Sequence, residues 1–230
     1  MKSYVTALLL LFLICSWMTD KTDVIATISK TEVHYDSADN NIFWTSGMNI
    51  DADGSPRAYH PVSDSGLDAL ANAGHKGDWW GIVTLKGEPV VQGSDDPVPG
   101  FYISCTALVC PGKHDTDCAR YVNSDSIPFI VIPAVKSVQQ YAKLGDIASV
   151  KNLRNGKSCY AICADVGPKD KIGEGSIYLA AQLGIPSSPR TGGVKDSVSW
   201  RVFIGSGNGT PRSRVVIDSI GRSRDSLLKK

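Results

Sequence analysis

Apolar and polar positions alternate over many short stretches of this chain, and Gly, Pro and Asn-Gly turns separate these stretches. A side-chain period of two is typical of strands that bury one face, and short runs of this kind between turn residues predict β-strands. The expected strands are residues 23–29, 32–35, 79–85, 89–92, 100–105, 127–133, 146–152, 160–165 and 199–204, with a further strand and its turn within 47–61.

Helical patterns are few. Residues 67–73 predict a helix of one to two turns, and residues 177–183 predict a second helix, with Ser176 as its N-cap and Gly184 after its end. Asn155-Gly156 is the strongest hairpin signal. Many short strands with few helices indicate a mainly-β fold, a single-domain barrel or a complex sandwich with a few short helices.

The N-terminus has the pattern of an export signal. Lys2 supplies a positive start, and residues 5–18 are nearly all apolar, a stretch that is short for a bilayer span but fits the apolar region of a secretory signal. We therefore expect residues 1–21 to be a signal peptide or lipoprotein signal. The expected location is outside the cell or in the periplasm or cell envelope, and Cys15 is a candidate site for a membrane lipid anchor.

Charge excludes one class of partner. The chain has 24 Lys and Arg against 23 Asp and Glu, a net charge of +1, and the basic residues are scattered. This balance gives no positive electrostatic potential that would attract nucleic acid, so we expect no nucleic-acid partner. Residues 212–230 are locally basic and are interpreted as a solvated tail or a terminal strand.

Five cysteines follow Cys15 in the chain, and export would permit disulfides. Cys110 and Cys118 lie in one loop-like stretch and are a plausible bridge, whereas Cys159 and Cys163 are four residues apart on an expected strand and are too far apart to bridge each other easily. The fifth residue is Cys105, and the odd count leaves at least one thiol unpaired. No zinc spacing accompanies these residues, so we expect no metal and no cofactor.

Candidate chemistry lies in one strand–loop–helix unit. The strand 160–165 ends in Asp165, and the following loop delivers Glu174 between two glycines. Alternation places Asp165 on the same face as Ala161 and Cys163, a face of small residues with room for a ligand. Two carboxylates in one such unit are what general acid–base chemistry requires. The alternatives are a turn acceptor for Asp165 and helix N-terminal charge complementarity for Glu174.

A second acidic pair, Asp51 and Asp53, precedes Gly54. The pair starts like a calcium loop, but Pro56 interrupts it and no Glu follows at the required spacing. The pair could instead bind a cationic substrate or pair with Arg57.

Two aromatic pairs accompany these acids, Tyr59-His60 and Trp79-Trp80. Adjacent strand residues face opposite ways, so one Trp is expected in the core and the other could be exposed, where it would stack on a sugar ring.

With these residues assembled, the chain resembles glycoside hydrolase family 75, the endo-acting chitosanases. The most specific part of the resemblance is Asp165 followed nine residues later by Glu174, in the pattern Ala-Asp…Ile-Gly-Glu-Gly-Ser-Ile. Residues 179–180 continue this pattern. Weaker parts are residues 49–54, 128–133 and 205–207, so that the resemblance spans roughly residues 48–207. The cysteines at 105–118 and the stretch around His114 have no counterpart in the family pattern that we can place.

The resemblance implies a catalytic domain over residues 22–230 that hydrolyses β-1,4 bonds of chitosan by inversion. Asp165 and Glu174 would be the catalytic pair, with Glu174 expected as the acid and Asp165 as the base. Substrate-binding candidates are Asp51, Asp53, Tyr59, His60, Trp80 and Asp170. A double-psi β-barrel is the leading specific fold, and we expect a monomer.

Two other functions remain open at this point. One is hydrolysis of a different amino-sugar glycan, such as peptidoglycan. The other is a non-catalytic cell-surface protein that binds carbohydrate.

Overall fold

The computed structural model describes residues 22–228 and is mainly β, with a closed six-stranded mixed barrel and three short helices. The barrel order is β3-β11-β8-β10-β9-β12, and β12 closes onto β3. The bounds are β3 Asn41–Asp51, β8 Phe129–Pro133, β9 Ile147–Asn152, β10 Ser158–Gly167, β11 Glu174–Ser176 and β12 Val194–Phe203.

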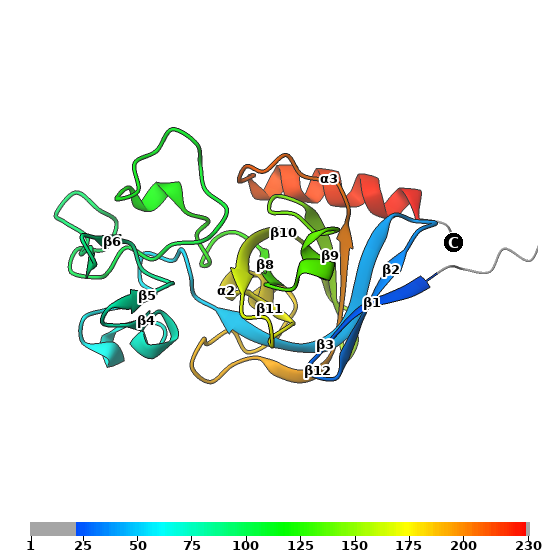
Figure 1. Ribbon diagram of the computed structural model, residues 1–230, viewed down its shortest axis with the longest axis horizontal. Coiled ribbons are helices and arrows are strands. Elements are labelled where there is room, and N and C mark those ends of the chain that lie inside the picture. The colour runs from blue at the N-terminus through cyan, green and yellow to red at the C-terminus, as the bar shows by residue number, and fades with distance from the viewer. Residues whose placement is uncertain (1–21, 229–230) are drawn as a thin grey trace, which may run out of the picture.

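A hairpin of β1 (Thr22–Ile28) and β2 (Thr31–Asp36) extends the sheet beyond β3. The three helices are α1 (Lys136–Gln139), α2 (Ile177–Gln182) and α3 (Arg214–Leu227). Figure 1 shows α3 lying along the outside of the barrel.

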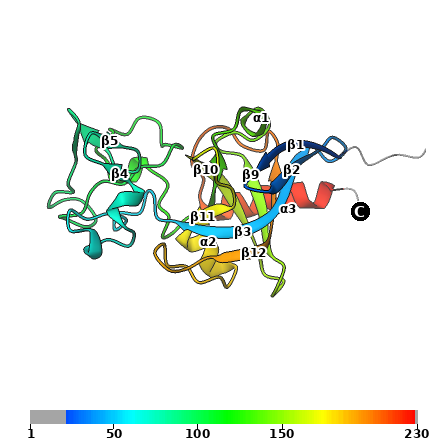
Figure 2. The same ribbon diagram turned by 60° about the horizontal axis from the view of Figure 1, so that its bottom comes forward.

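Residues 52–126, which we call the loop region, project from one end of the barrel in both views (Figures 1 and 2). Their regular structure is limited to short pieces: β4 (Gly74–His75), β5 (Asp78–Trp79), β6 (Thr84–Leu85), β7 (Glu88–Pro89) and the 3₁₀ turns Ser63–Ser65, Leu70–Asn72 and Cys118–Arg120.

Three apolar clusters hold these parts together. The largest fills the barrel and includes Trp44 and Trp200, whose rings stack at 5.9 Å between centroids. A second lies between the barrel wall and α3 and includes Ile162 and Ile217. A third, around Tyr59, belongs to the loop region.

Backbone bonds join the loop region to the barrel close to the predicted site. The Leu108 N–H donates to the Ala164 carbonyl on β10 at 2.8 Å, and the Tyr178 N–H donates to the Ser124 carbonyl at 2.9 Å. The Ser124 hydroxyl also donates to the Asp51 carbonyl at the end of β3. The loop region is therefore fixed to the ends of β3 and β10, where the predicted site residues lie.

The expectation of a mainly-β barrel with a few short helices is confirmed, while the double-psi topology stays a prediction. The expected helix at 67–73 is only a 3₁₀ turn, and the expected strands at 79–85 and 100–105 are short pairs and isolated bridges. These segments lie in the loop region, where contacts between residues distant in sequence override local propensity.

The interpretation of the C-terminal segment as a tail or strand is wrong, because residues 214–227 form α3. Ile217 and Gly221, four residues apart, share the helix face that packs on β10. A Cβ on Gly221 would lie 2.2 Å from the Tyr160 ring, and the Tyr160 hydroxyl donates to Asp225 at 2.5 Å. The glycine permits this close helix–strand contact.

The five cysteines within residues 22–228 are free thiols, so the expected Cys110–Cys118 bridge is not formed in this structure. Cys163 is buried, and the other four are partly buried. Cys15 and the expected export signal lie outside the described residues. Within the described part of the chain, no helix has the length and apolar character that a membrane crossing needs.

We predict that Trp200→Ala lowers the free energy of unfolding by about 3–5 kcal/mol, because Trp200 is fully buried and its removal leaves a cavity beside Trp44. Chemical denaturation followed by fluorescence would measure the change. Val215→Ala is the matched control, since Val215 is 79% exposed and should change stability by less than about 0.5 kcal/mol. Equal effects of the two variants would contradict the assignment of the barrel core.

Candidate active site

A β-bulge on β10 decides where Asp165 points. Cys163 pairs with Ile130 of β8, but Asp165 pairs with the next residue, Val131, so Ala164 is an extra residue in β10. Partners in register share a face, and Ile130 and Val131 face opposite ways. Asp165 therefore lies on the opposite face from Cys163, and the expectation that Ala161, Cys163 and Asp165 share one face is wrong.

Glu174 is the first residue of β11, so the expectation that a loop delivers it is wrong, and its position is set by the same residue of β8. Val131 pairs with Asp165 of β10 on one side and with Glu174 of β11 on the other. The two acids thus stand at one level of the barrel wall, separated by two strand spacings, or about 9.5 Å between backbones. A Cβ on Gly167 would lie 2.9 Å from Val131 Cγ1 and 3.4 Å from Glu174 Oε2, so the Glu174 carboxylate extends over this face.

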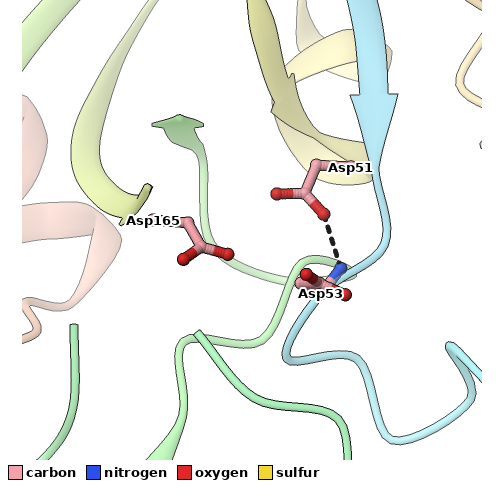
Figure 3. A group of neighbouring side chains, drawn as sticks. All are labelled: Asp51, Asp53 and Asp165. Carbon is pink, nitrogen blue, oxygen red and sulfur yellow. Dashed lines mark hydrogen bonds between the residues drawn. The ribbon is translucent and has the colours of Figure 1, made fainter. Parts of the chain in front are cut away.

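Asp51 and Asp53 join Asp165. Asp51 ends β3, and Asp53 follows in the chain that leaves the barrel, with its N–H donating to Asp51 Oδ1 at 2.7 Å. One carboxylate oxygen of each of Asp51, Asp53 and Asp165 lies within 4.8 Å of the others. Figure 3 shows the three carboxylates turned toward a common point between β3 and β10. The fold therefore brings Asp165 next to Asp51 and Asp53, which lie more than 100 residues earlier in the sequence.

Fixed donors hold each acid by one oxygen. The N–H groups of Ala107 and Val166 donate to Asp165 Oδ1 at 2.9 and 2.8 Å. The Tyr59 hydroxyl donates to Asp53 Oδ1 at 2.7 Å. Among the described residues, the donors to Asp165 and Asp53 bind Oδ1 of each acid. Oδ2 of each is therefore available to a ligand or a proton.

Burial and mutual repulsion both favour the protonated acids. Burial, opposed by the two backbone donors and reinforced by the charge of Glu174, raises the pKa of Asp165 to about 7. Burial and neighbouring acids raise the pKa values of Asp51 and Asp53 well above the usual range. Across residues 22–228, no Lys or Arg forms an ion pair with these three acids.

Glu174 has a different environment. Burial raises its pKa, the positive charge of Lys171 lowers it, and the negative charge of Asp68 raises it. Lys171 is thus the cation that most favours the ionised form of Glu174.

Tyr59 and Trp80, two other predicted binding residues, both lie near the acids but differ in exposure. Tyr59 is buried and supports Asp53 instead of offering a surface to a ligand. Trp80 is 56% exposed and precedes Gly81, where a Cβ would lie 3.0 Å from Asp53 Oδ1, so an exposed aromatic residue borders the acids. The Trp80 indole N–H donates to the Asn72 carbonyl at 2.8 Å, which fixes the ring.

His60 and Asp170 are not brought into the cluster of acids. His60 packs edge-on against Phe101 in the loop region. Asp170 is exposed, and its carbonyl accepts a hydrogen bond from Ser29. Arg57 pairs with Asp125 at 3.5 Å, so the alternative pairing of Arg57 with Asp51 or Asp53 is not seen.

Sequence reasoning missed several supporting groups. Asp68 is buried and close enough to affect both Glu174 and Asp53. The Ser104 hydroxyl lies 3.4 Å from Asp53 Oδ1, and the Ala107 N–H holds Asp165. No local pattern marks these residues, because they reach the acids only through the fold of the loop region.

The three clustered carboxylates could hold a divalent cation, since hard oxygen ligands suit Mg²⁺ and Ca²⁺. The same oxygens can also accept charge-assisted hydrogen bonds from an alkylammonium ion. What the arrangement requires is positive charge, from protons or from a bound cation. The chain matches no protein-family model and no curated protein sequence.

We predict that the stability of the protein falls as pH rises from about 4 to about 7. An unfolded Asp releases its proton near pH 3.9, whereas native Asp165 keeps it until about pH 7, so unfolding releases a proton in this window. Asp165→Asn should reduce the slope of unfolding free energy against pH by about 1 kcal/mol per pH unit. Denaturant titrations at a series of pH values would measure it.

Asp196→Asn is the control for that slope. Asp196 is exposed, and Ser197 and Arg154 lower its pKa, so its proton is released below the window in both states. An unchanged slope in Asp165→Asn would contradict the raised pKa of Asp165.

Proposed function

We propose that this protein is an endo-acting glycoside hydrolase that cleaves β-1,4 bonds between glucosamine residues of chitosan. The observation that carries the proposal is the pair Asp165 and Glu174, held at one level on the same face of the barrel wall through their shared partner Val131. This is the pair that the resemblance to family 75 selects, and its members come from different strands of one rigid barrel.

The separation of the pair supports inversion. An inverting enzyme needs about 6.5–9.5 Å between its carboxyl groups, to leave room for a water molecule on the far side of the sugar. The backbones of Asp165 and Glu174 are two strand spacings, about 9.5 Å, apart, and both side chains leave the same face, so carboxyl groups held in parallel directions would lie in this range. A retaining pair, at about 5–5.5 Å, would suit neighbouring positions such as Asp51 and Asp165 better.

The environments of the two acids favour one division of roles. Burial raises the pKa of both acids, to about 7 for Asp165, which therefore keeps a proton in mildly acidic solution. Glu174 alone of the two has a cation, Lys171, that opposes this rise and favours its ionised form. In this proposal Asp165 gives its proton to the glycosidic oxygen as the C1–O bond breaks. Glu174 accepts a proton from the water whose oxygen bonds to C1. This order reverses the one expected from the sequence.

The remaining acids suit the substrate. Chitosan carries an ammonium group on each glucosamine, and Asp51 and Asp53 offer carboxylate oxygens beside Asp165 without a Lys or Arg ion pair among the described residues. The positive charge of a bound ammonium group would favour the ionised forms of Asp51 and Asp53, which would then accept charge-assisted hydrogen bonds from it. An N-acetyl group would leave these charges unmatched, so the site should favour deacetylated sugars. The fixed, exposed ring of Trp80 could stack on a neighbouring sugar.

We predict that Glu174→Gln and Asp165→Asn each lower hydrolysis of soluble chitosan by about 10³-fold or more, because each removes a proton-transfer group. Loss of viscosity and release of reducing ends would measure the activity. Asp170→Asn should keep wild-type activity, since Asp170 is exposed and away from the clustered acids.

Substrates with an aryl leaving group separate the two roles. Such a group departs without protonation, so Asp165→Asn should regain most of its activity on aryl glucosaminides and Glu174→Gln should not. The reverse result would restore the order expected from the sequence. A folded wild type that cleaves peptidoglycan glycan but not chitosan, or binds glycans without cleaving them, would replace the proposal with one of the two other functions.

We also predict that Asp53→Asn raises KM for fully deacetylated chitosan by about tenfold, because it removes one charged acceptor of the ammonium group. The increase should be smaller on highly acetylated chains. Initial rates on chitosans of graded acetylation would measure both. A chelator such as EDTA should leave activity unchanged if ammonium and not a metal ion meets the acids, and loss of activity restored by Mg²⁺ or Ca²⁺ would contradict this.

A further inference from the structure

Arg190 connects the barrel to the loop region. It lies between α2 and β12, and its Nη2 donates to three backbone carbonyls, those of Ser63, Gly66 at 3.2 Å and Asp68 at 2.9 Å. Its Nη1 also lies 3.6 Å from Asp64 Oδ1. One planar guanidinium thus binds three carbonyls within six residues of a segment about 120 residues away in sequence.

Backbone hydrogen bonds close the loop that carries Arg190. The Gly192 N–H donates to the Ser188 carbonyl and the Gly193 N–H to the Pro186 carbonyl, both at 2.7 Å, which closes a tight loop around Arg190. A Cβ on Gly193 would lie 2.3 Å from the Met48 carbonyl, so this loop packs directly on β3. The next residue of β3, Asn49, is the partner of Glu174. The backbone of Arg190 is therefore anchored next to the part of β3 that pairs with Glu174.

The segment that Arg190 holds contains Asp68. The N–H groups of Leu67 and Asp68 donate to the carbonyls of Arg57 and Ala58, both at 3.0 Å. Asp68 is 5% exposed, and its Oδ1 accepts from the Ala69 N–H at 2.7 Å and from Asn72 at 2.9 Å. Its charge acts on both Asp53 and Glu174. A Cβ on Gly81 would lie 3.0 Å from Asp53 Oδ1 and 3.1 Å from Cα of Ala73, the residue after Asn72, so the Asp68–Asn72 unit lies close to the acids.

We propose that Arg190 is a positioning residue that ties residues 63–68 to the barrel and thereby fixes Asp68 beside Glu174 and Asp53. The three carbonyl bonds supply the tie, since the Asp64 side chain is 98% exposed and an exposed ion pair contributes little. Arg190 acts on the site through Asp68, whose buried charge adds to the negative potential that a cationic chain meets. Its effect on turnover rests on the proposed function, whereas its effect on the segment does not.

The first measurement is hydrogen exchange at residues 57–70, followed by mass spectrometry on the full chain. Arg190→Ala should speed exchange of the Leu67 and Asp68 amides by about tenfold or more, because their hydrogen bonds open when the segment is released. Arg190→Lys should lie between wild type and Arg190→Ala, since a single ammonium cannot match the planar fork. Asp64→Asn is the matched control and should exchange like wild type. Unchanged exchange in Arg190→Ala would overturn the proposal.

The second measurement separates positioning from a general loss of stability. Arg190→Ala should raise KM for chitosan by about fivefold and change kcat by less than about twofold, whereas partial unfolding would lower the apparent kcat and leave KM unchanged. Asp68→Asn should raise KM similarly, and the double variant should add nothing further, because both changes remove the same effect. Additive effects, or a fall in kcat alone, would overturn the positioning role.

These measurements also keep the two proposals apart. A wild type without activity on chitosan would remove the proposed function, yet exchange at residues 57–70 would still decide whether Arg190 holds the segment. Full chitosanase activity with unchanged exchange and KM in Arg190→Ala would remove only the role of Arg190.

Discussion

Repulsion among buried carboxylates is the constraint on which the rest of this structure depends. Asp51, Asp53 and Asp165 lie with oxygens within 4.8 Å of one another, Glu174 acts on all three, and no described Lys or Arg forms an ion pair with them. Removing charged groups from water without partners is costly, so this arrangement persists only because other parts of the fold stabilise it. The barrel supplies that stability, since its closed sheet and the Trp44–Trp200 core fix the strands that carry the acids.

The same constraint explains how the donors are distributed. Backbone N–H groups hold one oxygen of Asp165, and Tyr59 holds one oxygen of Asp53, which orients both acids without neutralising them. A Lys or Arg in their place would lower the pKa values and cancel the charge that a cationic substrate needs. Neutral donors instead keep the acids oriented and leave their protons exchangeable, as an acid–base catalyst requires. The tie through Arg190 follows the same principle, because its guanidinium binds backbone carbonyls and not the clustered acids.

How far the sequence predicts this structure depends on the range of the interactions. Alternation and turn residues identify β8, β9, β10 and the second half of β12, whereas the first half of β3 and the whole of β11 were not predicted as strands. The cap at Ser176 is confirmed by its bond from the Leu179 N–H. The bulge at Ala164 is invisible to alternation, because one inserted residue reverses every later side chain without changing composition. The loop region is least predictable, since Ala107, Ser104 and Asp68 reach the site through pairings between distant segments. The acids themselves were predictable from type and spacing, but their convergence on one point was not.

The clustered acids need positive charge from protons or from a bound cation, and this need connects the fold to the proposed chemistry. Above about pH 7 Asp165 loses its proton, the repulsion within the cluster grows, and a bound cation would offset it. A tightly bound metal ion would offset the repulsion at all times, and it would occupy the carboxylate oxygens that the proposed catalysis needs. A polymer with one ammonium group per sugar would offset the repulsion only while it is bound. When it dissociates, the carboxylate oxygens become free again. Binding would therefore be favoured by the relief of repulsion as well as by direct contacts, which gives a physical reason for a preference for deacetylated over acetylated chains.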